Sequence, residues 1–311
     1  MIVFRDPAEV PAGYGPSVVA IGKFDGVHSG HRAVIDRARV DAATGRARVV
    51  AVTFDRNPLA LLRPEICPEN LIGVHQKLQL LAETGIDATL LLRFDEQLAN
   101  LTAREFVEHV LVDALGVRTV MVGQDFRFGR GGAGNPEVLR ELGAEFGFDV
   151  DVVDDVRAIE PGRRVSSTWI RELLTEGDVE TASKLLGRPA SVWGEVVHGA
   201  KRGRELGYPT ANLAPELEGF RPADGVYATW AIIDGVRYPA ATSIGNNPTF
   251  EGVPEHRVEA YLIDQKVDLY DREIELEFVD YIRPMNRFDS VDALVAQLGA
   301  DVGQIRAILA G

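Results

Sequence analysis

The first half of the chain alternates short apolar runs with helical patterns, and this alternation restricts its fold more than any other feature. The apolar runs are typical of buried strands, and capped or glycine-terminated helical patterns separate them. The expected strands are 18–21, 48–54, 88–92, 118–122 and 148–153, and the expected helices are 32–43, 74–83, 102–115 and 136–146. The pattern predicts an α/β domain whose parallel sheet is covered by helices on both faces.

The pattern changes at about residue 187. Two short helical patterns, 169–175 and 179–186, end at Gly187, and Pro189 follows as a second helix-stop signal. The β-rich segments beyond this point are 192–198, 225–233, 237–244, 256–263 and 273–279, and a long helical pattern covers 291–309. We therefore expect two domains, 1–187 and 188–311. The second is predicted to be a closed all-β barrel with a C-terminal helix.

Composition excludes several classes of protein. A chain of 311 residues can bury two cores, and its net charge of −14 argues against general nucleic-acid binding. The single cysteine, Cys67, excludes an intrachain disulfide and a cysteine-based zinc cluster. We find no signal-peptide pattern and no apolar run of membrane-spanning length. The expectation is a cytoplasmic protein without nucleic-acid or membrane partners, in which any phosphate site is built from local groups.

A glycine-rich turn lies between the first expected strand and the first expected helix. It reads Gly22-Lys-Phe-Asp-Gly-Val-His28-Ser-Gly30-His31. A helix N-terminus offers free N–H groups and a positive dipole end to anions, and two histidines three residues apart can face the same side of its first turn. Gly30 removes a side chain, so a phosphate could approach closely. This arrangement suits attack on the α-phosphate of a nucleotide, whereas the alternative is two ordinary surface histidines at a helix cap.

A second segment has the residue types of an anion site. In Ser166-Ser-Thr-x-x-Arg171, hydroxyl groups at a predicted helix start can bind either the helix N–H groups or a phosphate. Arg171 lies one turn further and can bind the same anion through two hydrogen bonds. The alternative is a plain helix cap followed by a surface arginine.

The segment Gly129–Gly134 fits the pattern G-x-G-x-x-G of dinucleotide-binding turns. The preceding strand is expected to end at about residue 122, so these glycines do not form an immediate strand-to-helix turn. We expect a flexible loop on the substrate side of the domain instead. The chain also contains no G-x-x-x-x-G-K-[ST] motif, which excludes a Walker-type phosphate loop.

The β-rich half contains two candidate features. In Gly207-Tyr-Pro-Thr-Ala-Asn212, Thr210 and Asn212 offer hard oxygen ligands of the kind that Mg²⁺ prefers, although such a segment is also a common structural turn. Glu259 alternates with apolar residues on an expected strand, and on residue pattern alone it is a solvated carboxylate paired with Arg257. A further run of alternating glutamates is predicted to be a solvated sheet face without a catalytic role: Glu273, Glu275 and Glu277.

The His-x-Gly-His turn resembles the nucleotidylyltransferase superfamily motif. Together with 53–58, 165–171, 207–212 and 243–249, it makes the whole chain resemble the prokaryotic bifunctional riboflavin kinase/FAD synthetase family. The resemblance implies a Rossmann-like N-terminal domain that transfers AMP from ATP to FMN, giving FAD and pyrophosphate. It also implies a C-terminal barrel that phosphorylates riboflavin to FMN with ATP and Mg²⁺.

The resemblance also implies roles for individual residues. His28 and His31 would be catalytic in adenylyl transfer, and Glu259 would be the general base that takes a proton from the ribityl hydroxyl. The residues expected to contact ATP are Gly22, Phe24, Gly30, Ser166, Ser167 and Arg171. Those expected to contact the flavin or its phosphate are Asp55, Asn57 and Asp125, and those expected to bind the metal are Thr210 and Asn212.

One position departs from the family pattern. Many members have Phe-Asp-Pro-His-Pro where this chain has Phe54-Asp-Arg-Asn57-Pro, so slower adenylyl transfer is an open alternative. Two rival functions therefore stay open, a monofunctional riboflavin kinase with an impaired adenylyltransferase site and a non-catalytic flavin- or nucleotide-binding protein. The expected partners are riboflavin, FMN and ATP, and formation of a homo-oligomer is left open.

Overall fold

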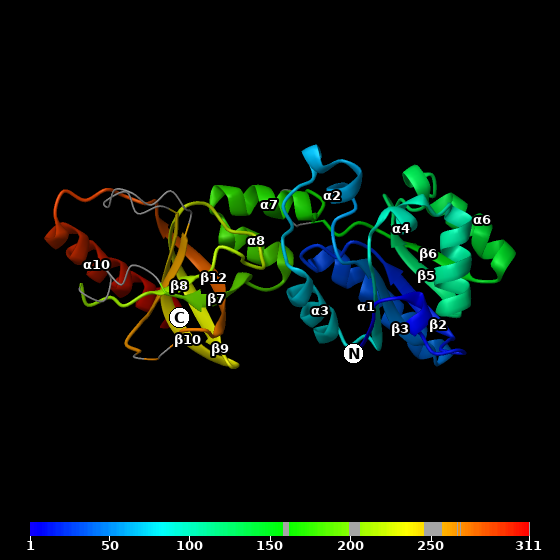
Figure 1. Cartoon of the computed structure of the whole chain (residues 1–311), viewed down its shortest axis with the longest axis horizontal. Helices are drawn as coiled ribbons and strands as arrows, with labels where there is room; N and C mark the ends of the chain where they lie inside the picture. The colour runs from blue at the N-terminus through cyan, green and yellow to red at the C-terminus, as the bar shows by residue number, and fades with distance from the viewer. Residues whose placement is uncertain (158–161, 199–205, 246–256, 266, 268, 311) are drawn as a thin grey trace. The chain divides into compact units, whose positions relative to one another are not determined.

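The computed structural model describes residues 1–157, 162–198, 206–245, 257–265, 267 and 269–310 (Figure 1). Contacts within the chain divide it into two compact units, Met1–Ser166 and Ser167–Gly311. The division falls before the boundary expected from the sequence, because the helices α7 (Ser167–Glu176) and α8 (Val179–Leu186) pack together and α8 contacts strands of the second unit.

The first unit is built on a six-stranded parallel sheet in the order β1-β4-β3-β2-β5-β6, which confirms the predicted α/β fold class. The five expected strands are present, and their continuous apolar runs reflect a sheet that is covered on both faces. The sequence analysis missed a short edge strand, β1, because three residues are too few to show a pattern. The strands are β1 (Ile2–Phe4), β2 (Ser17–Ile21), β3 (Arg48–Phe54), β4 (Ala88–Leu92), β5 (Val117–Gly123) and β6 (Asp149–Val153).

Helices cover both faces of this sheet, and Figure 1 shows α1 and α3 on one side and α6 on the other. The longer helices are α1 (Ser29–Gly45), α3 (Val74–Glu83), α5 (Ala103–Phe106) with the π-helix η3 (Val107–Ala114), and α6 (Pro136–Phe146). The shorter ones are η1 (Pro7–Glu9), α2 (Leu59–Leu62), η2 (Pro64–Ile66), α4 (Glu96–Asn100) and η4 (Arg130–Gly132). The expected single helix over 102–115 is therefore α5 followed by a π-helix, although its predicted capping box between Thr102 and Glu105 is present.

The strand order locates the place where a ligand binds in such a sheet. From β2 the chain continues to β3 and β4 on one side, whereas β5 and β6 lie on the other side of β2. In open α/β sheets, ligands bind at the carboxyl ends of the strands where the order reverses in this way. The turn Gly22–His31 follows β2 and the pair Gln124–Asp125 follows β5, so both lie at this point of the sheet.

The second unit contains a closed antiparallel barrel in the order β10-β11-β8-β7-β12-β9, as the sequence predicted. The sequence analysis missed β8, which has only three residues. The strands are β7 (Ala190–Val197), β8 (Ala211–Leu213), β9 (Gly225–Ile233), β10 (Val236–Gly245), β11 (Arg257–Leu262) and β12 (Glu273–Arg283). The C-terminal helix α10 (Val291–Ala310) packs against β9, β10 and β12.

The helix α10 has the length and composition of a membrane-spanning segment. The sequence analysis had expected no segment of this kind. Its alanines and aliphatic residues give a moderate mean hydropathy along an uninterrupted helix. A core helix of a globular protein has the same properties; α10 buries Leu294, Val302 and Ile305, but only 22% of its apolar stretch is buried. The helix is therefore weak evidence for a membrane span.

Candidate active sites

The turn between β2 and α1 has a strained backbone. Phe24 and Val27 adopt positive φ angles of 48° and 41°, and Gly26 between them has a φ of 90°. Positive φ is uncommon for a residue with a side chain and rare for a β-branched one, so the surrounding structure has to hold it. The side chains of Phe24 and Val27 are 1% and 0% exposed, and this burial supplies the anchor. The turn thereby places His28 at the N-cap position of α1.

His28 caps the N-terminus of α1 and stacks on His31. The Nδ1 of His28 accepts a hydrogen bond from the backbone N–H of His31 at 3.3 Å. In the neutral ring the proton is then on Nε2, which can donate to an anion. The ring centroids of His28 and His31 are 3.7 Å apart and the planes differ by 18°, so the two predicted residues lie together.

Gly30 serves this stack in a way that the sequence analysis did not anticipate. A Cβ atom at position 30 would lie 3.1 Å from Cε1 of His28 and 3.7 Å from the carbonyl oxygen of Val165. The glycine therefore leaves room for the imidazole of His28, and the close approach of a phosphate at Gly30 stays a prediction. At Gly22 an added Cβ would make an ordinary van der Waals contact of 3.4 Å with the ring of Phe24.

His31 is held neutral by its surroundings. Its Nδ1 is buried and has no hydrogen-bond partner in the part of the chain that the structure describes. Burial lowers the pKa of His31 well below its ordinary value of 6.5, and the charges of His28, Lys77, Arg164 and Lys23 act in the same direction. An unpaired, buried ring nitrogen beside several cations is suited to an anionic ligand.

This low pKa leads to a prediction about stability. In the unfolded chain the imidazole of His31 regains a pKa of about 6.5, so below that pH the unfolded state binds more protons than the folded state. The first domain should therefore lose stability as the pH falls from about 6.5 toward the folded-state pKa of His31, by at most about 1.4 kcal/mol per pH unit from this group. Calorimetric unfolding as a function of pH should show a shallower acid loss for His31→Gln than for the wild type.

The control for this experiment is His109→Gln, because His109 has an exposed side chain in η3. It should leave the acid dependence of unfolding close to that of the wild type. Equal acid slopes for wild type and His31→Gln would contradict the assignment of a low pKa to His31.

The polar residues after β3 are bonded to the backbone. Asp55 accepts a hydrogen bond from the N–H of Phe94 at 2.9 Å, and Asn57 accepts one from the N–H of Leu59 at 3.1 Å. Asn57 is 9% exposed and forms an Asx-type turn that leads into α2. The position that departs from the family pattern therefore has a local structural contact, and its amide NH₂ retains donor capacity.

The predicted site residue after β5 forms an ion pair. Asp125 lies 3.0 and 3.1 Å from the guanidinium of Arg164, and the hydrogen bond from Arg164 lowers the pKa of Asp125. Arg164 also contacts Asp155 at 3.0 Å, so it ties the ends of β5 and β6 together. Sequence reasoning missed Arg164, although it lies directly before the recognised Val165-Ser-Ser segment.

The second predicted anion segment is divided between the two units. Ser166 is the last residue of the first unit and follows Val165, which borders Gly30. Ser167 and Arg171 lie on α7 in the second unit. The expected grouping of all three residues around one phosphate therefore stays a prediction.

The loop Gly129–Gly134 is closed by pairing between Phe128 and Gly134, whose backbone N–H and C=O groups exchange hydrogen bonds of 2.9 and 3.1 Å. The helix α6 starts later, at Pro136, with Asn135 as its cap. The loop therefore does not have the geometry of a dinucleotide-binding turn, which confirms the sequence interpretation on this point.

In the second unit, the barrel brings Thr210, Asn212 and Glu259 together. Asn212 on β8 lies opposite Glu259 on β11, and the hydroxyl of Thr210 donates to Oε2 of Glu259 at 3.2 Å. The amide of Asn212 donates to the carbonyl oxygen of Thr210 at 3.4 Å. One carboxylate, one hydroxyl and one amide thus meet at this place in the barrel wall. In the described ranges there is no group of three or more His, Cys, Asp or Glu side chains that could hold a metal by themselves.

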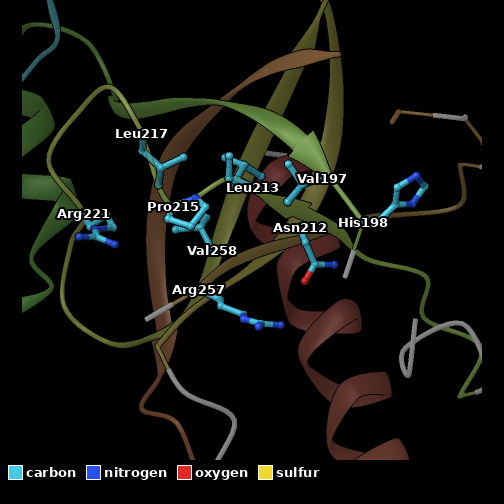
Figure 2. A pocket seen from close by; sticks show the side chains of 10 residues that line it. Val197, His198, Asn212, Leu213, Pro215, Leu217, Arg221, Arg257 and Val258 are labelled. Atoms are coloured by element: carbon cyan, nitrogen blue, oxygen red, sulfur yellow. The ribbon is translucent and has the colours of Figure 1, made fainter. Parts of the chain in front are cut away.

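A pocket of about 200 Å³ lies beside this cluster (Figure 2). Asn212 lines it, and its walls come from the end of β7, the start of β11 and the loop after β8. The lining residues are Val197, His198, Asn212, Leu213, Ala214, Pro215, Leu217, Arg221, Arg257 and Val258. The pocket thus combines apolar walls with basic side chains. Sequence reasoning missed the part formed by 214–221, which carries no recognisable motif.

The glutamates of β12 only partly follow the expectation of a solvated face. Glu273 is exposed, but the side chain of Glu277 is 20% exposed and forms an ion pair of 2.7 Å with Arg237. Burial raises the pKa of Glu277 and outweighs the charge and the hydrogen bond of Arg237, which lower it. The carboxylate of Glu277 is therefore held in an ion pair with Arg237 and is not a fully solvated group.

Comparisons with known proteins agree with the two-unit architecture. A family model described as FAD synthetase matches residues 11–169, and a second, described as riboflavin kinase, matches residues 186–309. The bifunctional riboflavin kinase/FMN adenylyltransferases of Escherichia coli (strain K12) and Pseudomonas fluorescens are 39% and 40% identical to the chain. The former match covers 91% of this chain and 90% of the relative, and the latter 94% and 93%. A solved structure described as a macrolide-efflux protein from Streptococcus pneumoniae is 35% identical, covers 98% of both chains and has a TM-score of 0.85.

A chain that joins a FAD synthetase domain to a riboflavin kinase domain is a two-domain transferase of flavin-cofactor synthesis. This chain belongs to the bifunctional riboflavin kinase/FMN adenylyltransferase family. It is an ATP-dependent enzyme that converts riboflavin to FMN and FMN to FAD. The comparisons favour this function over the two rivals, a monofunctional kinase and a non-catalytic binding protein.

Proposed function

We propose that the turn containing His28 and His31 carries out adenylyl transfer and that the cluster of Thr210, Asn212 and Glu259 carries out the kinase reaction. The observation that supports this assignment is that each group meets within its own unit. The family matches to residues 11–169 and 186–309 also support the functional boundary that we place at residue 187.

In adenylyl transfer, a phosphate oxygen of FMN attacks the α-phosphorus of ATP, a new P–O bond forms and pyrophosphate leaves. The chain supplies no nucleophile, so its task is to position the two substrates and to stabilise the negative charge that grows on the non-bridging oxygens. The Nε2–H of His28 and the helix start of α1 supply donors for that charge. The neutral ring of His31 can donate a hydrogen bond from its buried Nδ1 to the same anion.

The remaining residues would complete the adenylyl-transfer site. We assign ATP contacts to Gly22, Phe24, Gly30, Ser166, Ser167 and Arg171, and flavin or phosphate contacts to Asp55, Asn57 and Asp125. The geometry adds Arg164 to this group through its ion pair with Asp125. Asn57 cannot carry a positive charge, so adenylyl transfer slower than in relatives with histidine there stays a prediction.

In the kinase reaction, Glu259 would accept the proton of the riboflavin 5′-hydroxyl while the hydroxyl oxygen attacks the γ-phosphorus of ATP. The bond between the γ-phosphorus and the β,γ-bridging oxygen breaks, and ADP leaves. The hydrogen bond from Thr210 orients Oε2 of Glu259 and leaves its other oxygen for the substrate. The apolar and basic lining of the pocket in Figure 2 suits a nucleotide, and Asn212 links this pocket to Glu259.

Enzymes of this kind generally need a divalent metal, and we propose that Mg²⁺ fills this role. The donor set fits, because Thr210 and Asn212 offer hydroxyl and amide oxygens while the ATP phosphates would supply the rest. Bound there, Mg²⁺ would neutralise charge on the transferred phosphoryl group.

The Mg²⁺ dependence of FMN formation tests this assignment. Thr210→Val keeps the side-chain shape but removes both the metal ligand and the hydrogen bond to Glu259, so the Mg²⁺ concentration for half-maximal rate should rise about tenfold. Thr210→Ser should remain close to the wild type. FAD formation from FMN, measured on the same preparations, should be unchanged by either variant. An unaltered Mg²⁺ dependence in Thr210→Val would contradict the metal site.

We also propose that the enzyme acts in the cytoplasm without nucleic-acid or membrane partners. The net charge of −14 supports the first exclusion, and the packing of α10 against the barrel supports the second. The metabolic role of the relatives agrees with the location. Formation of a homo-oligomer stays untested.

A further inference from the structure

A buried lysine lies next to the adenylyl-transfer site. Lys77, on α3, is 8% exposed, although lysine is rarely buried. Its Nζ donates a hydrogen bond of 3.0 Å to the carbonyl oxygen of Phe54, the last residue of β3. Phe54 is its one hydrogen-bond partner among the described residues, which leaves two of the three ammonium protons for other groups.

The charged neighbours of Lys77 belong to the two strand ends that border the site. Burial lowers the pKa of Lys77, and the carboxylates of Asp25 and Asp55 counteract this effect. Asp25 lies in the histidine turn and is itself held by the N–H of Leu71 at 2.7 Å. The charge of Lys77 also acts on His31. One buried ammonium therefore lies within electrostatic reach of both the turn after β2 and the end of β3.

A hydrogen bond to Phe54 does not by itself require a charge. Taking an ammonium group out of water is unfavourable unless nearby charges compensate for it. The hydrogen bond to Phe54 alone therefore does not explain why a charged lysine is buried at position 77. Asp25 and Asp55 provide that compensation, and their own negative charge also has to be balanced. Asp55 also lies 3.7 Å from the guanidinium of Arg56, whose side chain is half exposed, whereas the buried ammonium of Lys77 acts on both carboxylates. Two carboxylates beside a site that receives ATP and FMN would repel both substrates if their charge were not balanced.

We propose that Lys77 is a positioning residue for adenylyl transfer, which fixes the Phe54–Asp55 end of β3 and balances the carboxylates of Asp25 and Asp55 so that anionic substrates can bind. The proposal rests on the assignment of adenylyl transfer to the turn containing His28 and His31. Lys77 itself acts through these neighbours.

The test compares Lys77→Met, which keeps the length without the charge, with Lys77→Arg, which keeps the charge. Lys77→Met should lower kcat/KM for FAD formation about tenfold or more, mainly through higher KM values for FMN and ATP, because the carboxylates of Asp25 and Asp55 then repel both substrates more strongly. Lys77→Arg should recover most of this loss. Riboflavin kinase activity on the same samples should be unchanged, and Lys184→Met, which removes an exposed lysine, serves as the matched control.

A titration of the His31 ring by NMR adds a readout that does not depend on turnover. Lys77→Met should raise the pKa of His31 toward its ordinary value, with the cations His28, Arg164 and Lys23 still in place. Lys77→Gln, which retains a donor for Phe54, should behave like Lys77→Met and provides a second uncharged variant if the methionine variant folds poorly.

Two results would overturn the proposal. One is a kcat/KM for FAD formation that stays at the wild-type value in the uncharged variants. The other is an equal loss in Lys77→Met, Lys77→Gln and Lys77→Arg with an equal fall in thermal stability, which would show a purely structural role. Failure of the underlying site assignment is recognised separately, because His28→Ala would then retain FAD formation.

Discussion

Replacing His28 with alanine is expected to lower the rate of FAD formation from FMN and ATP by about 10²–10³-fold, the usual loss when one donor to a developing oxyanion is removed. The variant removes the Nε2–H donor, the stacking partner of His31 and the side-chain cap of α1 at once. FMN formation from riboflavin should be unaffected, because the kinase residues belong to the barrel. Chromatography of the flavins after separate incubations with riboflavin and with FMN measures both rates.

Loss of the helix cap alone would cost about 1 kcal/mol of stability, so the structural and chemical effects of His28→Ala have to be separated. His28→Asn serves this purpose, since asparagine caps a helix but has no imidazole. It should restore thermal stability without restoring FAD formation. His109→Ala should match the wild type in both respects. Near-normal FAD formation by His28→Asn would show that the cap, and not the imidazole, is what the site needs.

Replacing Glu259 with glutamine is expected to lower FMN formation from riboflavin by about 10²–10⁴-fold, the range typical of a lost general base. Glutamine can still accept the hydrogen bond from Thr210, so the local structure should persist while the proton acceptor is lost. Supplied with riboflavin, the variant should make almost no FMN and hence no FAD. Supplied with FMN, it should make FAD at the wild-type rate.

The matched control is Glu273→Gln, which alters an exposed glutamate on β12 of the same barrel. It should leave both activities unchanged. If Glu259→Gln phosphorylated riboflavin at the wild-type rate, another group would have to accept the proton, and the assignment of Glu259 would be wrong. If it also lost FAD formation from FMN, a general folding defect would be the cause.

The two reactions are chemically linked within one chain. The kinase installs on riboflavin the phosphate that later acts as the nucleophile toward ATP. The first reaction needs a base to activate a hydroxyl group, whereas the second starts from a phosphate that is already anionic. This difference explains why a carboxylate is proposed for the barrel site and hydrogen-bond donors at a helix start for the other.

The sequence by itself determined the fold class and the family. Continuous apolar runs alternating with helical patterns are local properties of the chain, so the parallel sheet and the change to a barrel could be predicted without a structure. The spacing of His28 and His31 likewise predicted that they face the same side of the helix start, although the extended N-cap backbone of His28 is what places its ring on His31. Short elements such as β1 and β8 were missed because three residues show no period.

Only the tertiary structure decided the contacts between segments far apart in the chain. The register of β8 against β11 places Thr210 beside Glu259, and a hydrogen bond joins Lys77 on α3 to Phe54 at the end of β3. Gly30 likewise serves the ring of His28, and Asn57 turns back on its own backbone. Such contacts depend on strand register, burial and side-chain direction, which one sequence does not encode as a local pattern. The charges around His31 follow from the same packing, since they come from three separate segments of the chain, the turn with Lys23 and His28, α3 with Lys77, and the segment with Arg164.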